Sequence, residues 1–328
     1  MDKHSIENTD YTVGQDNLQK FGFDVHNPVF IISAALILIF LTAVLVSDSA
    51  AAKELLDGLK WSIIGAFDFV FMWAGNIFVL FCLGLLVSPY AKIRLGGKEA
   101  VPEHSLASWL AMLFAAGMGI GLMFWAVAEP VAYFTGWYGT PLGVEANTPE
   151  AASAAMGAVM YHWGFHPWAI YAVVALSLAF FCYNKGLPLS IRSIFFPILG
   201  DRTWGWAGHF IDILAVLATL FGLATSLGLG AQQAASGINH VFGTSGGVGL
   251  QILVIAGVTA LAVVSVVRGL EGGVKLLSSI NMLIAALLLL FVALVGFAVA
   301  MGTIPTTLWA YAENIIPLGN PHGREDET

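Results

Sequence analysis

Seven long apolar stretches constrain this chain more than any other feature of its sequence. A helix that crosses a bilayer needs about 20 mostly apolar residues, and each stretch is close to or above that length. The sequence therefore predicts an all-α polytopic membrane protein. The stretches run approximately over Pro28–Val46, Ile63–Val87, Leu106–Phe134, Met156–Tyr183, His209–Leu229, Leu250–Val267 and Leu276–Met301.

The composition excludes several classes of protein. Apolar residues make up 58% of the 328-residue chain, and charged residues make up only 10%. Ordinary soluble domains have about 45–50% and about 25%. A soluble enzyme or a disordered protein this poor in charge could not cover its surface. The net charge is −8 and no basic run is present, so we expect a lipid bilayer as partner and no nucleic acid.

The distribution of basic residues predicts an orientation. Most of the 13 Lys and Arg residues fall in the N-terminal segment or in the connections after the second, fourth and sixth stretches. The connections after the third and fifth stretches contain none. Basic connections remain in the cytoplasm, so the N-terminus is expected inside the cell and the end of the seventh stretch outside.

The third stretch contains a glycine run, Gly117-Met118-Gly119-Ile120-Gly121. One interpretation is close helix packing, since Gly117 and Gly121 form a GxxxG pair. The other is an unwound segment in mid-membrane, because each glycine weakens a helix by about 1 kcal/mol relative to alanine. Broken membrane helices expose backbone groups that bind ions and substrates in secondary transporters.

The fourth stretch carries a cluster of aromatic residues. At 100° per residue, Trp163, Tyr171 and Trp168 share one arc of a helix. They could form an interfacial aromatic belt. They could also form a cage for a cation, in which each aromatic face contributes about 0.5–2 kcal/mol. Both interpretations remain open from the residues alone.

Two histidines of the same stretch permit a different hypothesis. His162 and His166 are spaced i, i+4, as metal ligands on a helix would be. Glu129, which is followed by Pro130 near the outer end of the third stretch, could converge with them from another helix. It could equally be an interfacial carboxylate. A membrane-embedded metal site or enzyme is therefore the alternative hypothesis.

The fifth stretch places Thr219 and Ser226 on one helix face. Hydroxyl groups in membrane helices mostly bond to their own backbone, although these two could contribute to a cation site.

These motifs together resemble the betaine/carnitine/choline transporter family. The glycine run continues through Leu122-Met123-Phe124-Trp125 to Glu129-Pro130 and resembles the signature of that family. His162-Trp163-Gly164 with Trp168 and Tyr171 is similar to its fourth helix. Leu217–Gly222 and Ser226–Gly230 are similar to its fifth. The resemblance extends from about Pro28 onward.

The resemblance implies two peripheral helices followed by five-plus-five helices in an inverted repeat. Residues 1–27 would then be a cytoplasmic tail, and 28–103 the two peripheral helices with a cytoplasmic loop. Residues 104–303 would be the first five-helix transport repeat. Residues 304–328 would be a periplasmic interfacial segment of a chain truncated before the eighth helix.

The resemblance also assigns roles. Trp163, Trp168 and Tyr171 would bind the substrate as an aromatic cage, and Gly117, Gly119 and Gly121 would let the third helix unwind beside it. Backbone carbonyls of Ala115 and Met118 would bind one coupling cation, and the hydroxyl of Thr219 would be one ligand of a second sodium site. The family's sodium-coupled carriers place another hydroxyl four residues after Thr219, where this sequence has Leu223.

The expected function is secondary active uptake of a quaternary-ammonium osmolyte, glycine betaine or else choline or carnitine. Coupling would be to sodium or protons, with no other cofactor and no enzymatic activity. The expected location is the bacterial inner membrane, and trimers are common in the family, so a homotrimer is one expected assembly. A non-transporting fragment is a further alternative.

Overall fold

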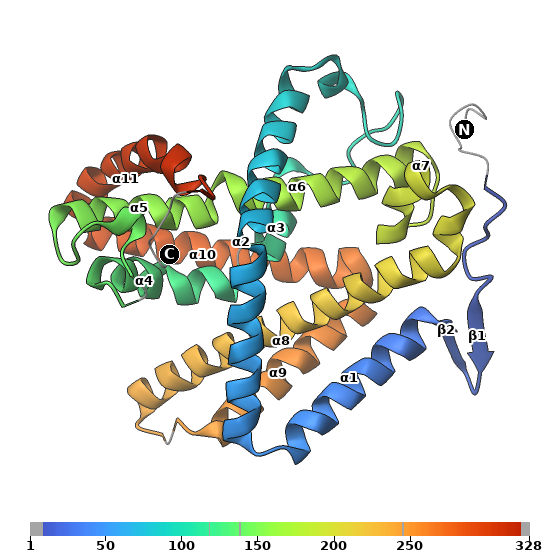
Figure 1. The fold of residues 1–328 in the computed structure, drawn as a ribbon, viewed down its shortest axis with the longest axis horizontal. Helices are drawn as coiled ribbons and strands as arrows, with labels where there is room; N and C mark the ends of the chain where they lie inside the picture. The colour runs from blue at the N-terminus through green and yellow to red at the C-terminus, as the bar shows by residue number, and fades with distance from the viewer. Residues whose placement is uncertain (1–8, 118, 138, 245, 323–328) are drawn as a thin grey trace. The chain divides into compact units, whose positions relative to one another are not determined.

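A computed structural model describes residues 9–117, 119–137, 139–244 and 246–322 (Figure 1). Regular structure in these ranges is helical apart from one antiparallel hairpin, which pairs Asn17 with His26 and Lys20 with Phe23. The principal elements are β1 (Asn17–Lys20), β2 (Phe23–His26), α1 (Val29–Val46), α2 (Ser49–Val87), α3 (Leu106–Gly117), α4 (Ile120–Thr135), α5 (Pro149–Trp163), α6 (Phe165–Ala179), α7 (Phe196–Leu199), α8 (Trp206–Phe242), α9 (Val248–Val267), α10 (Lys275–Val295) and α11 (Phe297–Leu318). Short 3-10 turns η1 (Pro89–Lys92), η2 (Pro141–Gly143), η4 (Ile191–Phe195) and η5 (Gly200–Trp204), and π-helical turns η3 (Phe180–Asn184) and η6 (Leu270–Val274), connect them.

The membrane-spanning character predicted from the apolar stretches is confirmed. Within the described ranges, 6 helical segments are long and apolar enough to cross a bilayer, and the bent pair α3 and α4 would make a seventh. The chain is therefore a polytopic all-α membrane protein. The long segments are Val29–Val46, Ser49–Val87, Pro149–Asn184, Trp206–Phe242, Val248–Val267 and Leu270–Val295.

The helices expose large apolar side chains along their length. Leu38 of α1, Val266 of α9 and Leu289 of α10 are each more than 60% exposed. Lipid can cover such surfaces, and a helix satisfies its own backbone hydrogen bonds where water is absent. The exposed apolar surface therefore fits a bilayer as the surrounding solvent.

Helix boundaries differ from the sequence-based spans at two places. α2 begins at Ser49, well before Ile63, because the Asp48 carboxylate accepts hydrogen bonds from the Ala50 and Ala51 amides and caps the helix. The last predicted span, Leu276–Met301, is wrong at its end. α10 stops at Val295 and α11 starts at Phe297, so Ile304–Ile316 lies within a longer helix.

Two breaks interrupt predicted spans. The third span divides into α3 and α4, whose axes are bent by 59°. α3 ends at Gly117 and α4 begins at Ile120, so the interruption predicted from the glycine run is confirmed at these helix ends. The fourth span divides at Gly164, whose φ and ψ of −93° and −128° leave the helical region.

The chain divides into two compact units. The first consists of Met1–Ala100 and His166–Gly222, and the second of Val101–Phe165 and Leu223–Thr328. The predicted boundaries after residues 27, 103 and 303 describe membrane position and function rather than compactness, and they stay predictions.

In the second unit, α5 packs against both α4 and α11, and α10 packs along α3. Figure 1 shows α5 and α11 lying side by side. The buried face of α5 consists largely of small residues, among them Ala151, Ala155 and Gly157. Small residues let helix backbones approach closely, which is the main source of helix association in lipid.

Candidate functional site

Glu129 is the buried acid of the second unit. Its side chain lies on α4, and the residue is only 7% exposed. One carboxylate oxygen accepts a hydrogen bond from Trp163 Nε1 at 2.7 Å, and the other is hydrogen-bonded to His162 Nδ1. The Tyr133 hydroxyl lies 3.3 Å from the same His162 nitrogen. Polar side chains of α4 and α5 thus meet at the Glu129 carboxylate.

These hydrogen bonds provide partners for the Glu129 carboxylate, which would otherwise be costly to bury. An ionised carboxylate only accepts hydrogen bonds, so His162 carries a proton on Nδ1 when it bonds to ionised Glu129. Hydrogen bonds to a charged group are shorter and stronger than neutral ones. The carboxylate therefore fixes the orientation of Trp163 at the C-terminal end of α5.

Trp163 also lies beside the glycine run. A methyl group built on Gly121 would stand 3.4 Å from Trp163 Cη2. Gly121 is in the first turn of α4, Gly119 caps that helix with φ and ψ of −115° and −124°, and Gly117 ends α3. The structure therefore brings Trp163 and Gly121 into contact next to the helix break.

The other two aromatic residues lie on α6 in the first unit. Trp168 and Tyr171 form an edge-to-face pair with ring centroids 5.8 Å apart. Tyr171 is 36% exposed and Trp168 is partly buried. Trp163 belongs to the second unit. The three-residue cage stays a prediction.

Ala115 and Thr219, two of the residues assigned to cation binding, each have a defined local environment. Ala115 lies in the last turn of α3, where helix carbonyls lack partners within the helix. Met118 lies outside the described residues. The Thr219 hydroxyl donates to the Ala215 carbonyl oxygen at 2.8 Å on an exposed face of α8, which is the backbone-bonded arrangement that its sequence context also allowed.

The proposed metal-binding trio does not form. His166 Nε2 is 3.0 Å from the Asn76 side-chain oxygen, in the first unit, whereas His162 and Glu129 pair in the second. Among the residues that the structure describes, no group of three or more His, Cys, Asp or Glu side chains is placed to hold a metal ion. The i, i+4 spacing of His162 and His166 assumes a continuous helix, and Gly164 interrupts this one, so the spacing itself gives no support to a metal site.

Tyr311 is a site residue that the sequence did not indicate. It is 8% exposed on α11, and its hydroxyl accepts a hydrogen bond from the Phe165 amide at 3.0 Å. A methyl group on Gly164 would stand 2.9 Å from that hydroxyl. Tyr311 thus supplies a partner for a backbone donor freed by the break. A glycine after the His-Trp pair was the only available signal.

A membrane helix broken beside an oriented tryptophan is an arrangement that secondary transporters use. The family model of the betaine/carnitine/choline family transporters matches residues 28–325. The chain belongs to this family.

Several bacterial relatives are similar over nearly the whole chain. A glycine betaine transporter of Vibrio parahaemolyticus is 74% identical over 327 residues, covering 100% of this chain and 62% of the relative. A glycine betaine/proline/choline/ectoine transporter of the same species is 65% identical, covering 99% and 58%. A glycine betaine transporter of Bacillus subtilis is 42% identical, covering 86% and 56%. The chain thus spans about 60% of the length of its Vibrio relatives.

Proposed function

We propose that this chain forms part of a secondary active transporter that takes up a quaternary-ammonium solute, with glycine betaine as its first substrate. The relatives named above as glycine betaine transporters support this proposal. The observation that carries the proposal is the position of Trp163. Its indole N–H donates a hydrogen bond to buried Glu129, and its ring lies beside Gly121. Choline, proline and ectoine, which appear in the name of one relative, are alternative substrates.

The chemistry of Trp163 suits a permanent cation. Its Nε1–H donates to Glu129 at the ring edge, so the electron-rich faces of the indole stay free for a trimethylammonium group. In this proposal Trp168 and Tyr171 supply further aromatic faces for the same cation.

The start of α4 suits the carboxylate of betaine. The first amides of a helix have no partner within it, and the helix dipole favours negative charge at that end. Gly119 and Gly121 lie at this helix start, where a missing side chain permits close approach. The glycine run would thus bind the anionic part of the substrate while the aromatic residues bind the cationic part.

Accumulation of solute requires a coupling ion, sodium or proton. The Ala115 and Met118 carbonyls are the proposed ligands of one sodium ion, and the Thr219 hydroxyl is one proposed ligand of a second. Thr219 donates its proton to Ala215, which leaves its oxygen lone pairs for an ion. The proposed orientation has the N-terminus in the cytoplasm of a bacterial cell. Assembly as a homotrimer belongs to the same proposal.

Uptake of labelled glycine betaine into proteoliposomes that contain the full-length protein tests this function. We expect uptake to require an inward sodium or proton gradient. Trp163→Ala should raise the KM by about 2- to 30-fold, which corresponds to one cation–π contact of about 0.5–2 kcal/mol. Trp309→Ala is the matched control, because Trp309 is 71% exposed on α11 of the same unit. Equal KM values for Trp163→Ala and wild type would refute the cage.

A further inference from the structure

Arg192 is a buried cation that the transport site does not use. It lies in η4 and is 4% exposed. The Arg192 Nε is 3.0 Å from one oxygen of the Asp212 carboxylate, and the Arg192 backbone amide donates to the other oxygen at 3.1 Å. Asp212 is in the first half of α8, so this ion pair joins η4 to α8 within the first unit.

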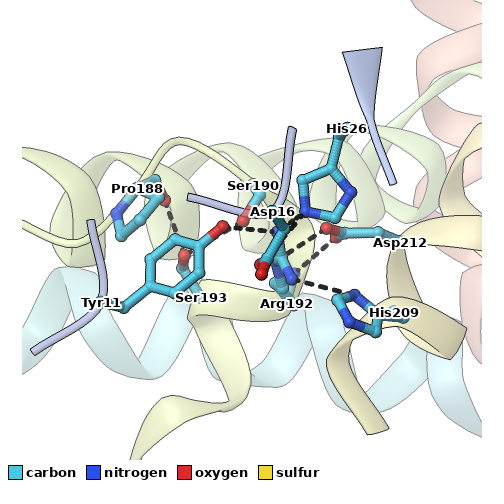
Figure 2. A network of polar contacts seen from close by, with 9 residues as sticks. All are labelled: Tyr11, Asp16, His26, Pro188, Ser190, Arg192, Ser193, His209 and Asp212. Carbon is cyan, nitrogen blue, oxygen red and sulfur yellow. Dashed lines mark hydrogen bonds and ion pairs between the residues drawn. The ribbon is translucent and has the colours of Figure 1, made fainter. Parts of the chain in front are cut away.

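The remaining guanidinium donors reach the N-terminal segment. Arg192 Nη2 is 2.8 Å from His26 Nε2 and donates to the Tyr11 hydroxyl at 3.3 Å. Figure 2 shows these side chains converging on Arg192, with Asp16 beside them. The Tyr11 ring also stacks on Trp204, with centroids 4.3 Å apart and ring planes 12° apart. Residues 11–26 are therefore docked on Arg192 and its neighbours.

A second histidine faces Arg192 from α8. Arg192 Nη1 is 3.3 Å from His209 Nδ1, and the rings of His26 and His209 meet edge to face at 5.5 Å. An arginine has only donors, so both contacts require a lone pair on the histidine nitrogen. The geometry thus assigns both imidazoles as neutral, with the proton of His26 on Nδ1 and that of His209 on Nε2.

Protonation of either imidazole would remove the nitrogen lone pair that accepts the hydrogen bond from Arg192. Two N–H groups would then face each other, and a second positive charge would lie next to the buried guanidinium. Asp16, whose oxygen is 3.7 Å from His26 Nε2, and Asp212 would attract the added proton. Asp212 is already paired with Arg192, and Asp16 is beyond hydrogen-bond distance, so neither restores the lost bond.

The pKa of His26 points the same way. Burial, together with the positive charge of Arg192, lowers the pKa of His26 below its usual value, even though Asp16 and Asp212 act against this. Burial also raises the pKa of the Tyr11 hydroxyl, which stays protonated across the same range. Because the docked state disfavours the charged histidine, docking is complete above about pH 6.5 and weakens as the pH falls below that value.

We propose that Tyr11, Asp16, His26, Arg192, His209 and Asp212 form a pH-operated clasp that holds the N-terminal segment against η4 and α8 while both histidines are neutral. Protonation releases the segment and uncovers Arg192. A released histidine has a pKa of about 6.5, so each histidine weakens docking by up to about 30-fold near pH 5. The device needs no substrate and does not depend on the proposed transport function.

Distance measurements between two spin labels test the clasp in the full-length protein. All native cysteines, Cys82 and Cys182 among them, are first replaced by alanine, and labels are placed on Val13→Cys and Asp201→Cys, two exposed positions of the first unit. At about pH 7.5 we expect one short, narrow distance distribution. At about pH 5, where carboxylates with ordinary pKa values are still mostly ionised, we expect a longer and broader one.

Two variants distinguish the clasp from general acid loosening. His26→Gln with His209→Asn keeps an acceptor near each nitrogen and cannot take up a proton, so it should stay docked at both pH values. Arg192→Gln should be released at both. The proposal is overturned if the wild-type distance does not change with pH. It is equally overturned if the double variant opens at about pH 5 like wild type, or is already open at about pH 7.5.

Discussion

At the scale of single residues, Glu129 acts by orienting a neighbour. Its carboxylate accepts the Trp163 N–H and binds His162, so its removal would leave the indole free to rotate. We expect Glu129→Ala to raise the KM for betaine uptake by up to, but not beyond, the about 2- to 30-fold expected for Trp163→Ala, because Glu129 acts on the substrate only through Trp163. Glu129→Gln keeps an oxygen acceptor and should raise the KM less.

Glu145→Ala is the control for this prediction, since Glu145 is an exposed acid between α4 and α5 of the same unit. Uptake kinetics for the three variants, with the amount of folded protein measured in parallel, give the comparison. A wild-type KM for Glu129→Ala would show that Trp163 needs no such partner.

The sequence indicated Trp163 and Glu129 separately but could not pair them. They are 34 positions apart on different helices, and adjacent helical residues such as His162 and Trp163 should point about 100° apart. Both reach Glu129 because α5 ends at this point, at Gly164. Partners that form across a helix break are not visible in periodicity.

At the scale of elements, helix contacts rest on close backbone approach. A methyl group on Gly157 of α5 would stand 3.1 Å from the Ala310 carbonyl oxygen of α11, whereas one on Gly222 of α8 would meet nothing within 4 Å. We expect Gly157→Ala to destabilise the protein by about 1–3 kcal/mol, because backbone must move. Gly222→Ala should be neutral or stabilise by up to about 1 kcal/mol.

Thermal unfolding of the full-length protein in detergent, followed by circular dichroism, measures this difference. Gly222→Ala is the matched control, as it makes the same substitution within a helix without a neighbour. If both variants unfold at the same temperature, the α5–α11 contact is looser than its geometry indicates.

The apolar stretches predicted which membrane helices exist, but they did not predict where every helix begins and ends. The first part of α2 contains Lys53, Glu54, Asp57 and Lys60, which lower its hydropathy without weakening its helix propensity. Span prediction therefore started too late there. The predicted span Leu276–Met301 ran past the end of α10 into α11. The first residues of α11 are as apolar as those of α10, so hydropathy did not reveal the break at Gly296.

At the scale of the whole molecule, the family match and the membrane helices define a transporter-family chain that spans about 60% of the length of its Vibrio relatives. The aromatic residues of the predicted cage are divided between two units, Trp163 in one and Trp168 and Tyr171 in the other. The cage stays a prediction, because helix periodicity places residues on one face of a helix but does not place one helix against another.

Binding measurements on two molecules that differ only in charge test the proposed cation cage most directly. Glycine betaine and its carbon analogue tert-butylacetate have nearly the same shape, but only betaine carries a positive charge. Titration calorimetry with the full-length protein measures both affinities. If aromatic faces bind the cation, betaine should bind more than about tenfold tighter, since several faces each contribute about 0.5–2 kcal/mol. Equal affinities would contradict a cation cage, and with it the proposed basis of substrate recognition.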